Sequence, residues 1–513
     1  MKRIAIALSK LDPGKGGVRA AFVLCAAAIA VPAQTFTTLH RFDGADGFQP
    51  AVSTQATDGN LYGTAFFGGA NCAPTGCGTV FKITPSGTLT TLYNLCSQSG
   101  CTDGSGPEGL VQVPNGDFYG TTYYGGANYS PPEVYGGTVF KITPQGALTT
   151  LYSFCSQSSC MDGELPMGGL VRATNGELYG TTYAGGASTY PCFSNVEGCG
   201  TVFKISLSGT LTTLHIFAGY PTDGGAPTAG LVQAANGDLY GTTAEGGASN
   251  NGTVFKITPS GTLTVLYSFC SQSSCLDGAG PGASLVQATN GDLYGTTQGG
   301  GASNDGTVFK ITPSGTLTTL YTFCSPDGCP VKPIPSALIQ ATDGNFYGTT
   351  YNGGDHCTPA GCGTVFKITP GGTLATLHSF CAQSGCTDGS SPEGLVQDTN
   401  GTFYGTTGFG GVAHSCTPSA PGCGTAFSLA TGLGPFVKTL PTSGKVGTSV
   451  KILGTNLTGA TGVTFNGTPA AFTINSSGTT ISTIVPAGAI TGKVQLVIPS
   501  GTLSSNVPFR VLP

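Results

Sequence analysis

Hydrophobic and polar positions alternate in short runs along most of the chain, and turn-forming residues separate the runs. In one representative stretch this alternation predicts four strands, at residues 231–235, 238–243, 252–258 and 262–269. The dipeptide Asn236-Gly237 separates the first two strands and favours a tight hairpin, and a Pro-Ser-Gly turn separates the last two. The pattern therefore predicts a sheet of four antiparallel strands as the local unit.

This unit recurs seven times along the chain. Its most regular part is the triplet Tyr-Gly-Thr, which begins at Tyr62, Tyr119, Tyr179, Tyr240, Tyr294, Tyr347 and Tyr404. A second motif, Gly-Thr-Val-Phe or Gly-Thr-Ala-Phe, follows each triplet. Four antiparallel strands that recur at a nearly constant interval predict the blades of a β-propeller.

The two ends of the repeat region complement each other. The seventh unit stops after Leu429 and lacks a fourth strand, whereas Thr35–Phe42 matches the fourth strand at Thr210–Phe217. We therefore expect the N-terminal segment to supply the outer strand of the last blade, which removes an open sheet edge. In this arrangement the short turns lie on one face and the longer loops share the opposite face.

The last eighty residues have a different composition. Residues 434–513 contain five basic residues and no Cys, His, Asp or Glu, whereas residues 34–433 contain 23 acidic and nine basic residues. Short alternating strands in this segment predict a small β-sandwich. The predicted fold class is all-β: a seven-bladed β-propeller at 34–433 closed by the N-terminal strand, followed by an immunoglobulin-like β-sandwich at 434–513.

The N-terminal segment has the pattern of a signal peptide. Five basic residues precede an apolar run at 20–31, and Ala33 follows at the spacing of a cleavage site. The run is too short for a membrane-spanning helix, which needs about 20 apolar residues. We predict a signal peptide at 1–33, export to the extracellular space, the cell surface or the periplasm, and no transmembrane helix in the mature chain.

The cysteines support export. Apart from Cys25, all of them form close pairs: Cys72/Cys77, Cys96/Cys101, Cys155/Cys160, Cys192/Cys199, Cys270/Cys275, Cys324/Cys329, Cys357/Cys362, Cys381/Cys386 and Cys416/Cys423. A repeat that lacks one cysteine of a pair also lacks the other, as disulfide bonding predicts. The alternative is a metal site, but Cys-x4-Cys without a second pair or a His is a poor zinc pattern.

Two family resemblances follow from these motifs. The unit Gly-x-Leu/Phe-Tyr-Gly-Thr-Thr, with the later Gly-Thr-Val-Phe-Lys-Ile, resembles the Gloeo/Verruco (GloVer) tandem repeat of secreted bacterial proteins. Residues 434–513 resemble an IPT/TIG domain, through Ser443-Gly444, Gly454-Thr455-Asn456 and Val485-Pro486. The second resemblance implies an immunoglobulin-like module that acts as a spacer or a binding accessory, and neither implies a particular chemistry.

A repeated aspartate is the first candidate for a binding site. The loops between successive units carry Asp46, Asp103, Asp162, Asp223, Asp277 and Asp388, each followed by Gly, and Val331 stands there in the remaining unit. A ring of carboxylates on the loop face would attract Ca²⁺ or hydroxyl-rich ligands. The alternative is Asp-Gly turn chemistry, in which the carboxylate bonds its own backbone. No other cofactor is predicted.

Variable aromatic residues and two histidines are further candidates. The aromatic residues follow the Tyr-Gly-Thr triplets and would either form a sugar-stacking rim or pack between blades: Phe66, Phe67, Tyr123, Tyr124, Tyr183, Tyr351 and Phe409. His356 and His414 lie near cysteine pairs and are candidates for metal or acid–base roles, or are solvated loop residues. His40, His215 and His378 replace tyrosines of other repeats, which indicates a packing role.

Other chemistries lack support in the sequence. No serine elbow motif or free thiol is present in the expected mature chain. Glu108 and Glu393 occur in Pro-Glu-Gly and would suit a glycosidase pair, but two steps around the ring are expected to keep them apart. The acidic repeat region disfavours nucleic-acid binding.

The sequence therefore favours an exported, monomeric, non-enzymatic binding or cell-surface protein. Its ligand face would be formed by the disulfide-stapled loops, and its partner would be a glycan or another surface protein. The first alternative is a propeller enzyme that acts on polysaccharide as a lyase or hydrolase, which requires a unique polar cluster near the mouth of the ring. The second alternative is a purely structural surface protein.

Overall fold

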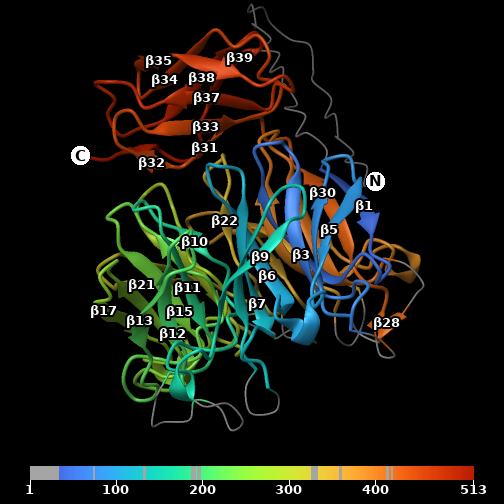
Figure 1. Ribbon diagram of the computed structural model, residues 1–513. Helices are drawn as coiled ribbons and strands as arrows, with labels where there is room; N and C mark the ends of the chain where they lie inside the picture. Colours follow the sequence, from blue (N-terminus) through green and yellow to red (C-terminus); the bar gives the residue numbers. More distant parts are fainter. Residues whose placement is uncertain are drawn as a thin grey trace, which may run out of the picture.

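The computed structural model describes residues 34–72, 76–130, 135–186, 192, 198–324, 333–356, 361–411, 415–417 and 420–513. The predicted signal peptide at 1–33 lies outside these residues. Within the described residues, the repeat region forms seven sheets of four antiparallel strands, which confirms the all-β fold (Figure 1). The described helices are four single 3-10 turns, η1 (Ser99–Cys101), η2 (Ser158–Cys160), η3 (Ser273–Cys275) and η4 (Ser384–Cys386). In the described part of the chain, no helix is long and apolar enough to cross a membrane.

The sheets, numbered 1 to 7 along the chain, share one strand order. The first strands are β2 (Phe48–Gln55), β6 (Ser105–Gln112), β10 (Val171–Arg172), β14 (Val232–Gln233), β18 (Val286–Gln287), β22 (Ile339–Gln340) and β26 (Ser390–Gln397). The second strands are β3 (Leu61–Phe67), β7 (Phe118–Tyr124), β11 (Leu178–Thr182), β15 (Leu239–Thr243), β19 (Leu293–Thr297), β23 (Phe346–Thr350) and β27 (Phe403–Phe409).

The third and fourth strands complete the sheets. The third strands are β4 (Thr79–Ile83), β8 (Thr138–Ile142), β12 (Thr201–Ile205), β16 (Thr253–Ile257), β20 (Thr307–Ile311), β24 (Thr364–Ile368) and β30 (Thr425–Ala430). The fourth strands are β5 (Leu89–Asn94), β9 (Leu148–Ser153), β13 (Leu211–Ile216), β17 (Leu263–Ser268), β21 (Leu317–Thr322), β25 (Leu374–Ser379) and β1 (Thr35–Arg41). The strands of sheet 4 lie within the four ranges that the alternation predicts.

The N-terminal strand closes the seventh sheet, as predicted. Strand β1 pairs antiparallel with β30, with Thr35 opposite Ala430 and Arg41 opposite Thr425. A buried hydrophobic cluster then joins sheet 7 to sheet 1, through Phe42, Phe48 and Tyr404 among others. Equivalent clusters join every other pair of successive sheets. The seven sheets therefore form a closed, propeller-like ring held by burial of apolar surface between neighbours.

The two repeated motifs form a single packing unit. Gly63 of Tyr-Gly-Thr lies opposite Phe81 of Gly-Thr-Val-Phe in the β3–β4 pair. A Cβ atom on Gly63 would lie 2.7 Å from Phe81 Cζ, and the corresponding distance is between 2.6 and 2.8 Å in all seven sheets. The phenylalanine rings are almost completely buried. The glycine is therefore required because the ring of the neighbouring strand occupies the space of its side chain.

The C-terminal segment forms the predicted sandwich. One sheet has the order β31 (Lys438–Leu440), β33 (Ser449–Leu453), β37 (Thr480–Ile484) and β36 (Phe472–Ile474). The other has the order β35 (Thr468–Ala470), β34 (Gly462–Phe465), β38 (Val494–Ile498) and β39 (Gly501–Ser504). A short parallel pair, β32 (Ser443–Gly444) and β40 (Arg510–Val511), completes it. Buried Val, Ile, Leu and Phe side chains from both sheets form its core.

The sandwich contacts the short turns of the ring (Figure 1). The Phe436 N–H donates to the Thr399 carbonyl at 2.9 Å, and Thr399 Oγ1 lies 3.0 Å from Thr455 Oγ1. Thr480 Oγ1 donates to the carbonyl of Thr57, in the first turn of sheet 1. Strand pair β28 (Ser415–Thr417) and β29 (Ala420–Pro421), which belongs to a long loop, lies toward the opposite end of the ring. The long loops are therefore at the face away from the sandwich, which we name the loop face.

Candidate functional site

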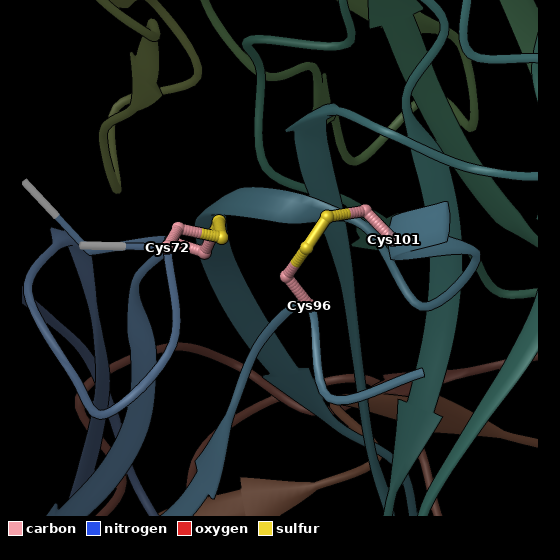
Figure 2. Close-up of side chains that lie close together, drawn as sticks. Cys72, Cys96 and Cys101 are labelled. Carbon is pink, nitrogen blue, oxygen red and sulfur yellow. A yellow bond between two sulfur atoms is a disulfide. The ribbon is translucent and has the colours of Figure 1, made fainter. Parts of the chain in front are cut away.

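Disulfides staple the loop face. Seven of the nine predicted bonds join described residues: Cys72–Cys77, Cys96–Cys101, Cys155–Cys160, Cys192–Cys199, Cys270–Cys275, Cys381–Cys386 and Cys416–Cys423. The two remaining predicted pairs include Cys329 and Cys357, which lie outside the described residues. Figure 2 shows two bonds side by side, with the sulfurs of Cys72, Cys77, Cys96 and Cys101 all within 4.8 Å of one another. The loops that link strands within sheet 1 and those that lead to sheet 2 are therefore adjacent.

The predicted aspartates lie inside individual loops. Asp103, Asp162, Asp277 and Asp388 are fully buried. Asp277 is typical: its Oδ2 accepts hydrogen bonds from Tyr267 Oη at 2.8 Å and from the Ser271 N–H and hydroxyl, both at 2.9 Å. Among the described residues, no three of the predicted aspartates bring carboxylate oxygens within 4.8 Å of one another. Each carboxylate of this kind organises the disulfide loop to which it belongs.

In three of the six predicted aspartate loops, a histidine takes the place of the tyrosine as the partner of the aspartate. Nε2 of His40 lies 2.6 Å from Asp46, Nε2 of His215 lies 2.6 Å from Asp223, and Nε2 of His378 lies 3.2 Å from Asp388. Burial would raise the pKa of Asp223, but hydrogen bonds from His215 and from the Ala218 N–H outweigh it and lower the pKa. These histidines therefore pair with aspartates in addition to packing. His356 is half-buried, and His414 lies outside the described residues.

The aromatic residues that follow the Tyr-Gly-Thr triplets divide into two groups, because alternate residues of the second strand of each sheet point to opposite faces of that sheet. Phe67 and Phe409 pack against Phe48, with ring centroids 5.9 and 5.6 Å apart, and belong to the cluster between sheets 7 and 1. One position earlier in the repeat stand Phe66, Tyr123, Tyr183 and Tyr351, which we name the inner rim. The rings of Phe66 and Tyr123 lie 5.8 Å apart, and a Cβ atom on Gly106 of sheet 2 would lie 2.9 Å from the Phe66 ring. Packing between sheets, one of the two alternatives, therefore occurs at Phe67 and Phe409, and the sugar-stacking rim stays a prediction for the inner rim.

Tyr124, another predicted site residue, adjoins the inner rim. Its ring lies 4.4 Å from that of Tyr123 and 6.1 Å from that of Tyr135. Burial raises the pKa of Tyr183 to about 12, with a further contribution from the charge of Glu245. The loop face near the inner strands therefore combines phenol rings with carboxylates from neighbouring sheets.

Although their sheets are two steps apart around the ring, Glu108 and Glu393 are near enough for the charge of Glu393 to contribute to the raised pKa of Glu108. They occupy β6 of sheet 2 and β26 of sheet 7, and β2 of sheet 1 lies between and contacts both strands. In β2, Ala51 pairs with Thr64 at the same register at which Glu108 pairs with Thr121. The intervening strand therefore offers only a methyl group at this level. The inner strands converge on the centre of the ring, so two steps around it cover a short distance.

The backbone around this pair departs from the repeat. Strands β2, β6 and β26 each have eight residues, whereas the first strands of the other four sheets have two. In sheet 7, Gly408 stands where the inner rim has an aromatic residue. A Cβ atom there would lie 3.7 Å from Glu393 Oε1 and 3.9 Å from Gln49 Cγ. The missing side chain leaves Glu393 uncovered by its own sheet.

Both glutamates are half-buried, and neither has a protein partner among the described residues. Burial raises the pKa of Glu108 to about 8, with a contribution from the charge of Glu393, and burial raises the pKa of Glu393 to about 7. Neither carboxyl group forms a hydrogen bond or ion pair with any described residue, although both side chains retain some accessible surface. Burial, neighbouring tyrosines and the charge of Glu108 raise the pKa of Tyr123, and burial and the charge of Glu393 raise that of Tyr351. Two acids and two phenols therefore form one group.

Two departures from the repeat could have indicated this group in the sequence. Pro-Glu occurs only at Glu108 and Glu393 among the equivalent positions, where sheet 1 has Pro50-Ala51, and Gly408 alone lacks a side chain at the rim position. Their proximity could not be inferred from the sequence, because it depends on how closely the inner strands converge.

Comparisons with solved structures give distant likenesses. A fungal alcohol oxidase of the AA5 family in complex with copper is 13% identical with a TM-score of 0.49, covering 93% of this chain and 99% of that chain. A putative gluconolactonase is 13% identical with a TM-score of 0.34, over 64% of this chain and 89% of that one. The PQQ-bound aldose sugar dehydrogenase of Streptomyces coelicolor is 10% identical with a TM-score of 0.35, over 78% and 99%. No curated protein sequence matches the chain.

Family comparisons agree with the sequence resemblances. The Gloeobacter/Verrucomicrobia repeat matches residues 27–195 and 188–357, which together span more than half of the chain. The IPT/TIG domain matches residues 435–511, which form the sandwich. The chain therefore belongs to the Gloeobacter/Verrucomicrobia repeat family and carries an IPT/TIG domain at its C-terminal end.

Proposed function

We propose that this protein is an exported, non-enzymatic binding protein of the cell surface that recognises a glycan at the inner rim of the loop face. The repeat and the IPT/TIG domain suggest a surface or binding protein. The disulfides fit an extracellular location. The observation that carries the proposal is the grouping of Glu108 and Glu393 with Tyr123 and Tyr351, where neither carboxyl group has a protein partner among the described residues.

The chemistry of the group suits a hydroxyl-rich ligand. Aromatic rings offer apolar faces on which sugar rings stack, while carboxyl groups accept hydrogen bonds from sugar hydroxyls. Both glutamate side chains keep accessible surface and have no partner among the described residues, so their carboxyl groups are open to hydrogen bonds from a ligand. The surrounding loops are held by disulfides, which reduces the ordering that binding would otherwise require.

The second candidate function is hydrolysis or elimination at a glycosidic linkage. Two carboxyl groups with raised pKa values resemble the acid and base pairs of glycoside hydrolases. This is the unique polar cluster that an enzyme would require, formed by residues other than His356 and His414. A purely structural surface protein would have no ligand at this group.

The test is a glycan array with the oxidised protein, residues 34–513, read for binding and followed by analysis of each bound glycan for cleavage. The binding proposal predicts a hit that the Tyr123→Ala variant loses and the Tyr220→Ala variant, altered at an exposed loop tyrosine, keeps. Cleavage products that disappear in Glu108→Gln would replace binding with catalysis. A blank array would contradict the glycan proposal and favour a protein partner or a structural role.

A further inference from the structure

The inner rim adjoins acidic side chains that have no compensating cation among the described residues. The charge of Glu393 adds to the effect of burial on the pKa of Glu108, and the charges of Glu108 and Glu164 both raise the pKa of Tyr123. Within the described part of the chain, no Lys, Arg or His forms an ion pair with Glu108 or Glu393. Burying like charges together is costly unless an opposite charge joins them. The arrangement is therefore complementary to a cationic ligand.

The neighbours of the carboxyl groups distinguish between kinds of cation. Ca²⁺ is normally held by six to eight oxygen ligands. Around Glu108 and Glu393 the structure instead places the rings of Tyr123 and Tyr351, the side chain of Gln49 and the bare backbone of Gly408. The faces of phenol rings attract organic ammonium groups, and carboxylates accept hydrogen bonds from the ammonium N–H groups. A site with phenol rings and few other oxygen ligands therefore suits an organic ammonium group better than Ca²⁺.

The missing side chain at Gly408 defines the direction from which a ligand would approach Glu393. Phe66 covers Gly106 of sheet 2, whereas Gly408 leaves Glu393 and Gln49 uncovered on the seam between sheets 7 and 1. An ammonium group that entered over Gly408 would lie beside Glu393 and Gln49. A sugar ring that carries this amine would rest on the aromatic residues beside it.

We propose that the glutamate pair and the inner rim recognise an amino sugar with a free, protonated amine, as in a glucosamine oligosaccharide. This inference rests on the proposed glycan-binding function and specifies its ligand class. The ammonium group replaces the missing protein cation, and the hydroxyl-bearing ring occupies the aromatic rim.

The test compares calorimetric binding of a glucosamine hexamer with that of the N-acetylglucosamine hexamer, using the oxidised 34–513 chain at neutral pH. The expected result is binding of the free-amine hexamer at least about tenfold tighter, because acetylation removes the charge that the carboxylates recognise. The Glu108→Gln/Glu393→Gln variant should lose this preference. The Glu177→Gln variant should keep it, because Glu177 pairs with Lys204.

Several outcomes would overturn the inference. They are equal binding of the two hexamers, a preference that survives Glu108→Gln/Glu393→Gln, and equally tight binding of spermidine, which offers amines without sugar rings. Unchanged far-ultraviolet circular dichroism shows that the double variant has folded, and Tyr351→Leu provides a second variant that removes an aromatic face and no charge. If neutral glycans bind the array while the hexamers are not distinguished, the ligand class is wrong and the proposed function remains. If no glycan binds at all, both fail.

Discussion

The Thr399 backbone N–H donates a hydrogen bond to Gln55 Oε1 at 3.1 Å across the seam between the last sheet and the first. Five other junctions use the same bond, in which a first-turn N–H meets a glutamine of the next sheet: Thr57 to Gln112, Thr174 to Gln233, Ala235 to Gln287, Thr289 to Gln340 and Thr342 to Gln397. At the junction of sheets 2 and 3, Pro114 has no N–H and Arg172 replaces the glutamine, with its Nε buried and without a partner. This junction therefore lacks both the N–H donor and the glutamine acceptor of the bond that the other six junctions form.

The missing bond can be restored. The double variant Pro114→Ala/Arg172→Gln supplies both donor and acceptor, and we expect a coupling energy of about 1 kcal/mol in a double-mutant cycle. Either single variant lacks one partner and should gain nothing from this bond. Denaturant unfolding of the four proteins measures the coupling, and additive effects of the two substitutions would show that no bond forms.

The buried aspartates are expected to stabilise loops without metal. Asp277→Ala removes the acceptor shared by the Tyr267 and Ser271 side chains and leaves the Ser271 N–H unpaired, at a cost of about 1–3 kcal/mol. Thermal unfolding should show this loss equally with calcium and with chelator. A chelator that lowers the unfolding temperature of the parent protein, and has no effect on Asp277→Ala, would instead support a calcium site at the predicted aspartates.

The glutamate pair is expected to destabilise the folded protein at neutral and alkaline pH. The unfolded chain loses these protons near the ordinary value of 4.5, whereas the folded chain holds them until about pH 7 for Glu393 and about pH 8 for Glu108. Stability therefore falls as the pH rises through this window. Glu108→Gln/Glu393→Gln should unfold several degrees higher than the parent at pH 8.5 and at the same temperature at pH 4. A constant difference at both pH values would contradict the raised pKa values.

The contact between ring and sandwich places a half-buried lysine near a buried aspartate. Asp398 is 2% exposed, and its Oδ2 has no hydrogen-bond partner, while burial lowers the pKa of Lys438 to about 8. Asp398→Asn/Lys438→Met should be as stable as the parent or more so, because a neutral pair avoids desolvation of two charges. Lys438→Met alone should be less stable, because it leaves Asp398 without a nearby cation.

At alkaline pH the stability of the parent protein and that of the double variant should depend differently on pH. The unfolded lysine keeps its proton to about pH 10.5 and the folded lysine only to about pH 8, so this residue adds stability as the pH rises between these values. The double variant lacks Lys438 and should not show that contribution. Unfolding at pH 8 and pH 10 measures it, and identical pH profiles would show that Lys438 is not buried in solution.

The sequence by itself determined the features that depend on local pattern. Strand positions in sheet 4, the closing strand at Thr35–Arg41 and the pairing of nearby cysteines all follow from period-two alternation, repeated motifs and short separations along the chain. These features involve neighbours in sequence or copies of one unit, so the residues carry enough information to place them.

The tertiary structure alone decided the grouping of the candidate site. Glu108 and Glu393 are far apart in sequence, and only the convergence of β26, β2 and β6, with Ala51 between, brings their charges together. The split between Phe67, which packs in the core, and Phe66, which joins the inner rim, depends on which side of β3 faces the neighbouring sheet. Non-local geometry of this kind arises from packing around the closed ring, and the pattern of one strand does not contain it.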